Sequence, residues 1–446
     1  MKRLLLMLLA GFSVALAQEP HITVPYTRFT LPNGLTVILH EDHTTPTIAV
    51  NTWVWVGSSR EKPGRTGFAH LFEHLMFMGS PHVPEGMFDQ WLESAGGDNN
   101  ASTSEDRTNY YENIPSNALE LPLFLDSDRF GYLAQSMTPE KVNLQRSVVK
   151  NERRQSYENR PYGMADIILG ENLFPPDHPY HWPVIGSMED LNAASFQDVL
   201  EFFRKYYVPN NASLVVAGDI DPVRTRILIE KWYDEIPAGA PVPPLTAPPV
   251  MITQEKRLVN EDKVQLPRLY MAWVTPKQFA PGDAQLDLLA SVLARGKNSR
   301  LYKRLVYDMQ IAQDVSAFQQ SERLASNFMI IATARSGHTL AEIETVIEEE
   351  LNRIKAEPPS LRELQRAINQ YEAAFYRNLE RVNSKADNLN DYLFSTGDPD
   401  YFNEDLARYR AADPTDIQNA AQTYLPDNGR VILSVVPTGK KELGTK

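Results

Sequence analysis

The feature that most limits the possible folds of this 446-residue chain is an internal repeat. The segments "YYVPNNASLVVAGD" and "TYLPDNGRVILSVV" each show a helix end, a proline turn and a buried strand, and Pro209 and Pro426 are 217 positions apart. The same spacing aligns a strand-like pair of segments and a helix-like pair: 52–56 with 269–273, and 70–79 with 287–296. Several segments that share one spacing predict two structurally similar halves.

A proline-rich stretch, 237–256, separates these halves and predicts an extended linker. We therefore expect an N-terminal domain over 18–236 and a C-terminal repeat domain over 257–446. Both halves alternate helical and strand-like patterns, which predicts an α+β fold in which each domain is an antiparallel β-sheet packed with α-helices. Asn33-Gly34 in "FTLPNGLTVIL" predicts a hairpin with a type I′ turn.

The first 17 residues are typical of a cleavable signal peptide. A basic start is followed by an apolar run over 4–14 and by the small-residue site Ala15-Leu16-Ala17. The apolar run is too short to cross a bilayer comfortably, so a short membrane anchor is the weaker alternative. We expect a periplasmic or secreted protein without a membrane anchor.

The net charge of −13 argues against nucleic acid as a partner, because phosphate binding needs a basic surface. The chain has no cysteine. An exported chain without disulfides depends on its core for stability, and any metal site in it must use histidine and carboxylate ligands.

The stretch "RTGFAHLFEHLMFMGS" combines an apolar helix with ionisable side chains. Thr66 as N-cap and Gly79 after the C-terminus predict a helix over about 67–78. His70, Glu73 and His74 share one narrow arc of this helix. Burying three ionisable groups is costly unless they pair with one another and with backbone or hold a metal ion.

The repeat favours the metal over a hydrogen-bonded pair of core histidines. At the corresponding positions the second half has Asp287, Ala290 and Ser291, so packing of this helix does not require the ionisable set. His-x-x-Glu-His is the inverzincin signature, in which two imidazoles at i and i+4 reach one ion beside a carboxylate.

Glu152 is the candidate third ligand. It lies in a predicted helix over 138–160, on the side of Val148 and Val149, where a carboxylate needs a cation or good donors. The alternative is a buried pair with an arginine, although Arg153 and Arg154 face elsewhere on the helix.

Together with "VVKNERRQ" around Glu152, the "HLFEH" motif resembles the pitrilysin/insulysin-type zinc metallopeptidases, in the bacterial branch related to the mitochondrial processing peptidase. The similarity covers nearly the whole mature chain, including "GGDNNASTSEDRTNYYENIP", "HPYHWPVIGSMEDL" and "NSRLYKRL". The resemblance implies that His70, His74 and Glu152 bind one Zn²⁺ per chain and that Glu73 is the general base that removes a proton from the attacking water. Two histidines and a glutamate would also accept manganese or cobalt.

In the family the segment 96–115 includes an edge strand that pairs with the substrate backbone, and Asn100 and Ala101 are the residues we expect to make this contact. Recognition of backbone predicts loose sequence specificity and favours peptides or unfolded chains.

The sequence departs from the family pattern in two segments. Gln145 stands where a second glutamate often lies seven positions before the ligand glutamate. The segment 305–315 has Tyr307 and Gln313 where active members have an Arg and a Tyr that hold the substrate carbonyl. Either Arg304 or Tyr307 substitutes through a local shift, or a homologous metal-free subunit supplies the pair.

We therefore expect an exported zinc endopeptidase that is the catalytic subunit of a heterodimer. The rival from another class is a non-catalytic peptide-binding or assembly subunit that retains a structural metal. A further alternative is an enzyme that works alone as a homodimer.

Overall fold

The computed structural model describes residues 21–445, so the predicted signal peptide 1–17 lies outside the described residues. Two β-sheets organise the chain, with strand orders β1-β2-β6-β3-β5-β4 and β7-β11-β8-β10-β9. The strands of the first sheet are β1 (Thr27–Thr30), β2 (Thr36–Glu41), β3 (Thr47–Val54), β4 (Asp98–Thr103), β5 (Thr108–Pro115) and β6 (Ala212–Gly218). Those of the second are β7 (Lys256–Asp262), β8 (Arg268–Thr275), β9 (Ala312–Gln320), β10 (Ser326–Ala334) and β11 (Val431–Pro437).

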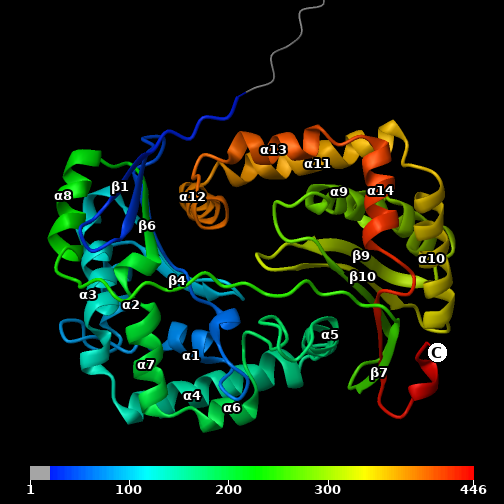
Figure 1. Cartoon of the computed structure of the whole chain (residues 1–446), viewed down its shortest axis with the longest axis horizontal. Coiled ribbons are helices and arrows are strands. Elements are labelled where there is room, and N and C mark those ends of the chain that lie inside the picture. The colour runs from blue at the N-terminus through cyan, green and yellow to red at the C-terminus, as the bar shows by residue number, and fades with distance from the viewer. Residues whose placement is uncertain (1–20, 446) are drawn as a thin grey trace, which may run out of the picture.

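Helices surround both sheets, which confirms the α+β class (Figure 1). The first half contains α1 (Phe68–Leu75), α2 (Met87–Ser94), α3 (Glu120–Ser136), α4 (Pro139–Arg153), α5 (Ala165–Leu173), α6 (Met188–Ala193), α7 (Phe196–Tyr206) and α8 (Pro222–Tyr233). The second half contains α9 (Asp283–Ala294), α10 (Leu340–Ala356), α11 (Leu361–Asn378), α12 (Val382–Thr396), α13 (Phe402–Arg410) and α14 (Pro414–Tyr424).

The two halves share one topology, as the internal repeat predicted. Strands β2-β6-β3-β5-β4 occupy the same places as β7-β11-β8-β10-β9. Each sheet is mostly antiparallel but contains one parallel pair, β2 with β6 and β7 with β11, which the sequence pattern did not predict. The first residue of β6, Ala212, pairs with Val54, and the first residue of β11, Val431, pairs with Ala272. The spacing of the repeat in these strands is therefore slightly larger than the 217 residues between the two prolines.

The predicted hairpin near the N-terminus forms, but its turn type differs from the prediction. The N–H of Leu31 donates to the carbonyl oxygen of Leu35 across a three-residue loop, and Gly34 has a φ of +91°. Asn33 does not share this positive φ, which a type I′ turn requires at both central residues. Its buried side-chain amide instead donates to the carbonyl oxygens of Tyr233 and Ile236 at the end of α8.

Each sheet is covered on one face by a helix from the other half. Helix α12, from the second half, packs Ala386, Leu389 and Leu393 on the first sheet, against residues such as Ile38 and Val215. Helix α5, from the first half, packs on the second sheet beside β8 and β11. Figure 1 shows α12 next to β6 and α5 below β9 and β10. The two halves are thus joined through their cores.

Polar contacts accompany this exchange. Asn390 of α12 is fully buried and bonds to Ser213 of β6 and to the carbonyl oxygen of Asn51 in β3. Lys385, also on α12, forms an ion pair with Asp42 just after β2. Because buried polar groups need partners, these bonds fix how far α12 lies along the sheet.

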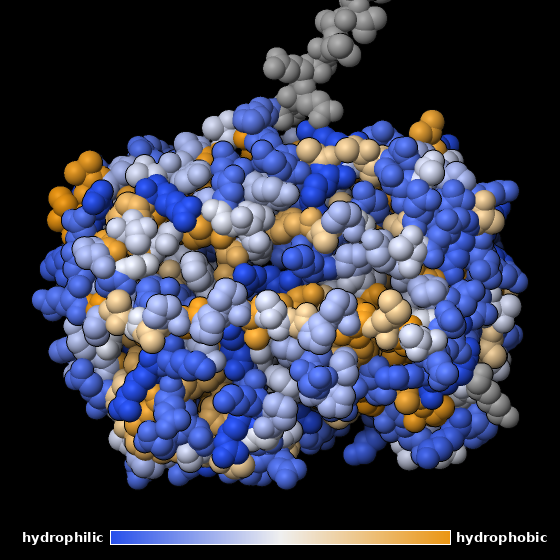
Figure 2. All heavy atoms as spheres, viewed as in Figure 1, coloured by the Kyte–Doolittle hydropathy of each residue, from blue (hydrophilic) through white to orange (hydrophobic). Residues whose placement is uncertain are grey.

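The predicted linker carries no helix or strand up to residue 255, and Lys256 already belongs to β7. It runs across the front of the molecule between the two halves (Figure 1) and forms a pale band on a mostly hydrophilic face (Figure 2). The carbonyl oxygens of Pro243 and Gly239 accept hydrogen bonds from Arg60 and Asn210. The domain boundaries at 236 and 256 stay a prediction.

The opposite faces of the sheets hold the larger cores. In the first half, α1 and α3 pack on β5 and β3 and α8 packs on α3, and in the second half α9, α10 and α14 cover β8 to β10. Within residues 21–445, no helix is both long enough and apolar enough to cross a membrane.

The exchange of helices predicts that a cavity in α12 weakens the whole chain. Leu389→Ala removes a fully buried side chain between α12 and the first sheet, and we expect the unfolding free energy to fall by about 2–5 kcal/mol. Ile227→Ala, at a side chain that is 59% exposed on α8, should change it by less than about 0.5 kcal/mol. Urea denaturation followed by circular dichroism measures both, and equal effects would contradict the packing role of α12.

Candidate metal centre

Helix α1 begins differently from the prediction, because Thr66 does not cap it. The first helical turn is preceded by Gly67 with a φ of +84°, a conformation that favours glycine. The hydroxyl of Thr66 donates to Asp190 instead. The carboxylate of Glu61 takes the capping place, accepting the N–H groups of Gly67 and Ala69 at 2.9 and 2.7 Å.

Glu61 is buried, and this burial raises the pKa of its carboxyl to about 8 against the lowering effect of the backbone donors. The two oxygens of this carboxyl group accept hydrogen bonds from N–H groups that the helix cannot bond internally. Glu61 therefore holds the end of α1 that lies just before His70.

The helix ends at Leu75, three residues before the predicted end. Two tighter turns follow, in which the N–H groups of Phe77 and Met78 donate to the carbonyl oxygens of His74 and Leu75. Gly79 has a φ of +77°, as expected of the residue that follows a helix end.

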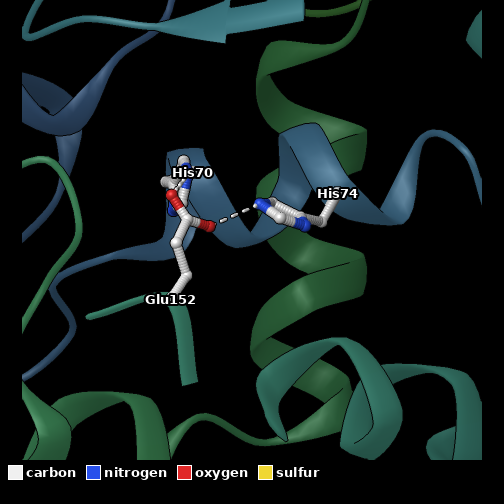
Figure 3. Close-up of side chains that lie close together, drawn as sticks. All are labelled: His70, His74 and Glu152. Atoms are coloured by element: carbon white, nitrogen blue, oxygen red, sulfur yellow. Dashed lines mark ion pairs between the residues drawn. The ribbon is translucent and has the colours of Figure 1, made fainter. Parts of the chain in front are cut away.

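The structure brings the three predicted ligands together. The Nε2 atoms of His70 and His74 lie 3.7 and 3.2 Å from the two carboxylate oxygens of Glu152. One ligand atom from each side chain lies within 4.8 Å of the other two, the only such group of three His, Cys, Asp or Glu residues among residues 21–445. Figure 3 shows the Glu152 carboxylate, from the end of α4, between the two imidazoles of α1.

This arrangement fits a zinc ion. Ligand atoms at ~2.0–2.1 Å in tetrahedral geometry lie about 3.4 Å apart, close to the two histidine–glutamate distances. Two imidazoles and one carboxylate from the protein leave one position of the ion for a water molecule, as in catalytic zinc sites. Our expectation of the residues that hold the ion thus agrees with their positions.

The electrostatics of the three side chains suit metal binding. Burial lowers the pKa of His70 to about 4, so its imidazole is neutral with a free electron pair at neutral pH. A hydrogen bond from His74 lowers the pKa of Glu152, which is therefore ionised. Neutral histidine and ionised carboxylate are the forms that bind metal ions.

Glu73 lies on the same arc of α1 but has a different partner. The hydroxyl of Thr103, the last residue of β4, donates to its Oε2 at 2.6 Å. Burial raises the pKa of Glu73, and the hydrogen bond from Thr103 opposes this shift. A carboxylate with a raised pKa beside a metal site is a stronger proton acceptor than an exposed one.

Glu152 was chosen as a candidate ligand because Val148 and Val149 indicated that it lies on an apolar helix face, and this argument is only partly correct. Val149 is fully buried, but the side chain of Val148 is 41% exposed, so the apolar face is narrower than expected. The arginine alternative fails, because Arg153 donates to the carbonyl oxygen of Gly186 and pairs with Glu158, and Arg154 donates to Asn151. A π-helical turn, Arg154–Glu158, follows directly after α4, a feature often found at functional sites.

The predicted substrate strand is β4, which forms an edge of the first sheet. Ser104 and Arg107 are hydrogen-bonded at its turn, so the alternation of an antiparallel pair directs the backbone groups of Ala101 and Thr103 away from β5. The N–H of Ala101 is bound by the side chain of Asn100 at 2.8 Å. Ala101 thus offers a backbone edge, while Asn100 covers this edge with its side chain.

A cavity of about 350 Å³ lies between the halves near this edge. Its wall includes Glu105 of the β4–β5 turn, Tyr157 of the π-helical turn, and Phe318 of β9. Tyr180 connects the same two regions, because its hydroxyl donates to Asp106 and accepts the N–H of Leu324.

The residues that departed from the family pattern do not join the metal centre. Gln145 donates to the sulfur of Met78. Arg304 pairs with Glu349 and Glu350 of α10, and Tyr307 is 73% exposed. The alternative that Arg304 takes the role of the family's carbonyl-binding Arg is therefore wrong, because its guanidinium group is bound within the second half.

The second half has no counterpart of the metal group among its described residues. Asp287 of α9 accepts a hydrogen bond from Tyr409, and burial raises its pKa to about 7. Ser291 donates to Gln370 of α11 at 2.9 Å. In the second half the corresponding helices thus carry hydrogen bonds to Tyr409 and Gln370 in place of the candidate ligand group.

Two family profiles match the chain: "Insulinase (Peptidase family M16)" over residues 36–168 and "Peptidase M16 inactive domain" over residues 193–371. The chain belongs to peptidase family M16. The first profile contains the metal group and the second covers most of the half that lacks it, in agreement with the resemblance drawn from the sequence.

Curated relatives have similar lengths. The chain is 29% identical over 368 residues to the zinc protease PqqE of Helicobacter pylori, covering 82% of each protein. It is 23% identical over 440 residues to a probable mitochondrial-processing peptidase subunit beta of Arabidopsis thaliana, covering 95% of this chain and 81% of the relative.

Solved structures share the fold. A protease from Helicobacter pylori matches with a TM-score of 0.86 and 27% identity, over 93% of this chain and all of the other. The first half of the periplasmic protease PqqL from Escherichia coli matches with a TM-score of 0.78 at 17% identity, over 94% of each chain.

Sequence reasoning missed Glu61 and Thr103. Thr103 is 30 residues from Glu73, so no local pattern marks it. Glu61 is six and eight residues before its partners Gly67 and Ala69, but Thr66 offered a more usual N-cap beside the helix start.

The capping role of Glu61 predicts a loss of stability in Glu61→Ala. The methyl group leaves the N–H groups of Gly67 and Ala69 without their acceptor, so we expect the unfolding free energy to fall by about 1–2 kcal/mol. Glu85→Ala, at an exposed position, should change it by less than about 0.5 kcal/mol. Urea titrations compare the two variants, and indistinguishable curves would remove Glu61 from its place in the support of α1.

Proposed function

We propose that this chain is an exported zinc endopeptidase that hydrolyses peptides and unfolded chains, with Glu73 as general base. The single observation that carries the proposal is the meeting of His70, His74 and Glu152 within 4.8 Å, with Glu73 on the same helix as the two histidines. The relatives named zinc proteases support zinc as the metal and peptides as the substrates.

His70, His74 and Glu152 would hold the ion. Bound there, zinc supplies a Lewis acid that lowers the pKa of water and stabilises negative charge on the scissile carbonyl. Glu73 accepts the proton of the attacking water and delivers it to the leaving amine, and Thr103 orients the carboxylate for both transfers. The raised pKa of Glu73 assists the first transfer because it brings the base nearer to neutral pH.

Strand β4 would bind the substrate in an extended conformation. Its free edge can add a strand, and Thr103 connects the end of that strand to Glu73. Binding requires that Asn100 release the N–H of Ala101. Because backbone groups make these contacts, folded proteins without a free extended segment would be poor substrates.

A metal-free homologous subunit would complete the site. The carbonyl-binding Arg and Tyr are not supplied by Arg304, which is paired on α10, or by the exposed Tyr307. Subunit beta of a mitochondrial-processing peptidase is among the relatives, which supports a two-chain assembly. We place the protein in the periplasm or outside the cell, since periplasmic PqqL shares its fold and the first 17 residues fit a signal peptide.

The proposal predicts that zinc content and turnover separate in two variants. Glu73→Gln should keep one zinc per chain, because the ligands are intact, and lose at least about 100-fold in kcat, because the base is gone. Glu152→Gln should lose both, whereas Glu93→Gln on α2 should lose neither. Metal analysis and hydrolysis of an unfolded reporter chain, with the homologous subunit added, measure the two quantities.

A Glu73→Gln chain that cleaves as fast as wild type would contradict the role of Glu73. If the wild-type chain binds zinc and peptides but cleaves nothing, alone or with the homologous subunit, the non-catalytic subunit is favoured instead. Cleavage by the purified chain alone would favour the homodimer.

The edge-strand proposal predicts that Ala101→Pro raises KM. Proline removes the N–H that faces away from β5, and edge strands tolerate proline at such positions. We expect KM to rise about tenfold with unchanged zinc content, whereas Ala101→Ser, which keeps the N–H, should behave like wild type. An unchanged KM in the proline variant would show that the substrate backbone does not pair at Ala101.

A further inference from the structure

A wide groove on the second half is lined by arginines. It has a volume of about 980 Å³ and lies where α11 meets the end of α9 and the junction of α13 and α14. Five arginines and a single carboxylate are among its lining residues: Arg295, Arg362, Arg366, Arg377, Arg410 and Asp413. This concentration of positive charge stands out in a chain whose net charge is −13.

Most of this charge is not neutralised within the chain. Across the part of the chain that the structure describes, Arg295, Arg362, Arg366 and Arg377 have no ion pair, and the Nη2 atom of Arg366 is buried without a hydrogen-bond partner. The carboxylate of Asp413 accepts the N–H of Asp416 at the start of α14, so it is already engaged. A guanidinium nitrogen that is buried without an acceptor, like this one of Arg366, is costly, and the exposed Arg295, Arg362 and Arg377 can bind an anion from the solvent side. An anionic ligand would therefore supply acceptors to all four side chains.

The groove is not purely polar. Leu361, the first residue of α11, lines it with a side chain that is 76% exposed, and the buried Leu364 and Ile368 lie behind. An exposed leucine beside arginines offers contact to an apolar group as well as to an anion. Inorganic phosphate would satisfy the arginines but leave this apolar surface in water.

We propose that this groove docks an acidic, leucine-containing segment of a partner protein. Guanidinium groups bind carboxylates through two parallel hydrogen bonds, and clusters of arginine recognise acidic motifs. The four unpaired arginines lie on or directly after helices, so no backbone has to become ordered when a ligand binds.

The position of the groove favours a partner over a substrate. Its lining residues come only from the second half, and none belongs to α1, α4 or β4, which carry the candidate metal centre and its edge strand. A segment bound there is not presented to Glu73 and persists uncleaved.

The test is the binding of a fluorescein-labelled ten-residue peptide of Glu-Glu-Leu repeats to the full chain at low salt, followed by fluorescence anisotropy. We expect saturable binding that weakens at least about tenfold when Arg362 and Arg366 are both changed to Glu. Arg204→Glu, the same charge change at an exposed position on α7, should leave binding unchanged. Leu361→Ala should weaken the binding of the peptide but not the binding of tripolyphosphate.

Several results would overturn the proposal. These are no binding to wild type, equal losses in the groove and Arg204 variants, and binding of tripolyphosphate without the peptide. Inhibition of peptide hydrolysis by the Glu-Glu-Leu probe would assign it to the substrate site instead, and loss of a wild-type dimer in the groove variant would make the occupant a second copy. If the double variant unfolds, Arg362→Gln with Arg377→Gln, both at exposed positions, replaces it in the same comparison.

Discussion

The candidate site of the first half depends on bringing a carboxylate from α4 to two imidazoles on α1. These groups are partly withdrawn from water, so each must find a charged or metal partner, and their mutual distances of 3.2 and 3.7 Å meet that requirement. The elements around them act as supports. Glu61 bonds the start of α1, and Arg153 anchors α4 to the carbonyl oxygen of Gly186.

A second consequence is the link between the metal centre and the substrate edge. Thr103 ends β4 and holds Glu73, so the strand proposed to align the peptide also orients the group proposed to move its proton. The turn after β4 reaches the second half, where Asp106 accepts the N–H of Arg323. A change in the contact between the halves would therefore alter both the substrate edge and the position of the Glu73 carboxylate.

The two halves share one architecture but carry different polar groups on the corresponding pair of helices. In the first half the helix pair α1 and α4 carries the ionisable group, whereas in the second half α9 and α11 are joined by Ser291 and Gln370. The second pair carries unpaired arginines toward an open groove instead. Because α5 and α12 are exchanged between the halves, neither half can lose its partner without exposing an apolar sheet face.

The sequence alone determined the class of fold, the repeat, the helix with His70, Glu73 and His74, and the choice of Glu152 as the candidate third ligand. These follow from local periodicity and from motifs whose chemistry restricts the residue types. It also indicated the edge strand around Asn100 and Ala101. Local patterns failed where the partner is remote or the backbone decides, as in the turn at Asn33 and the cap at Gly67.

Only the tertiary structure decided the parallel strand pair in each sheet, the exchange of α5 and α12, and the capping by Glu61. The first two depend on contacts between segments that are distant along the chain, such as Asn390 with Ser213, and the third on how the loop before α1 folds back onto its first turn. Burying an apolar helix face lowers the free energy whichever sheet covers that face. The sequence pattern of α12 therefore predicts which of its faces is apolar but not which sheet the helix packs on. That choice is made by shape and hydrogen bonding in the assembled chain.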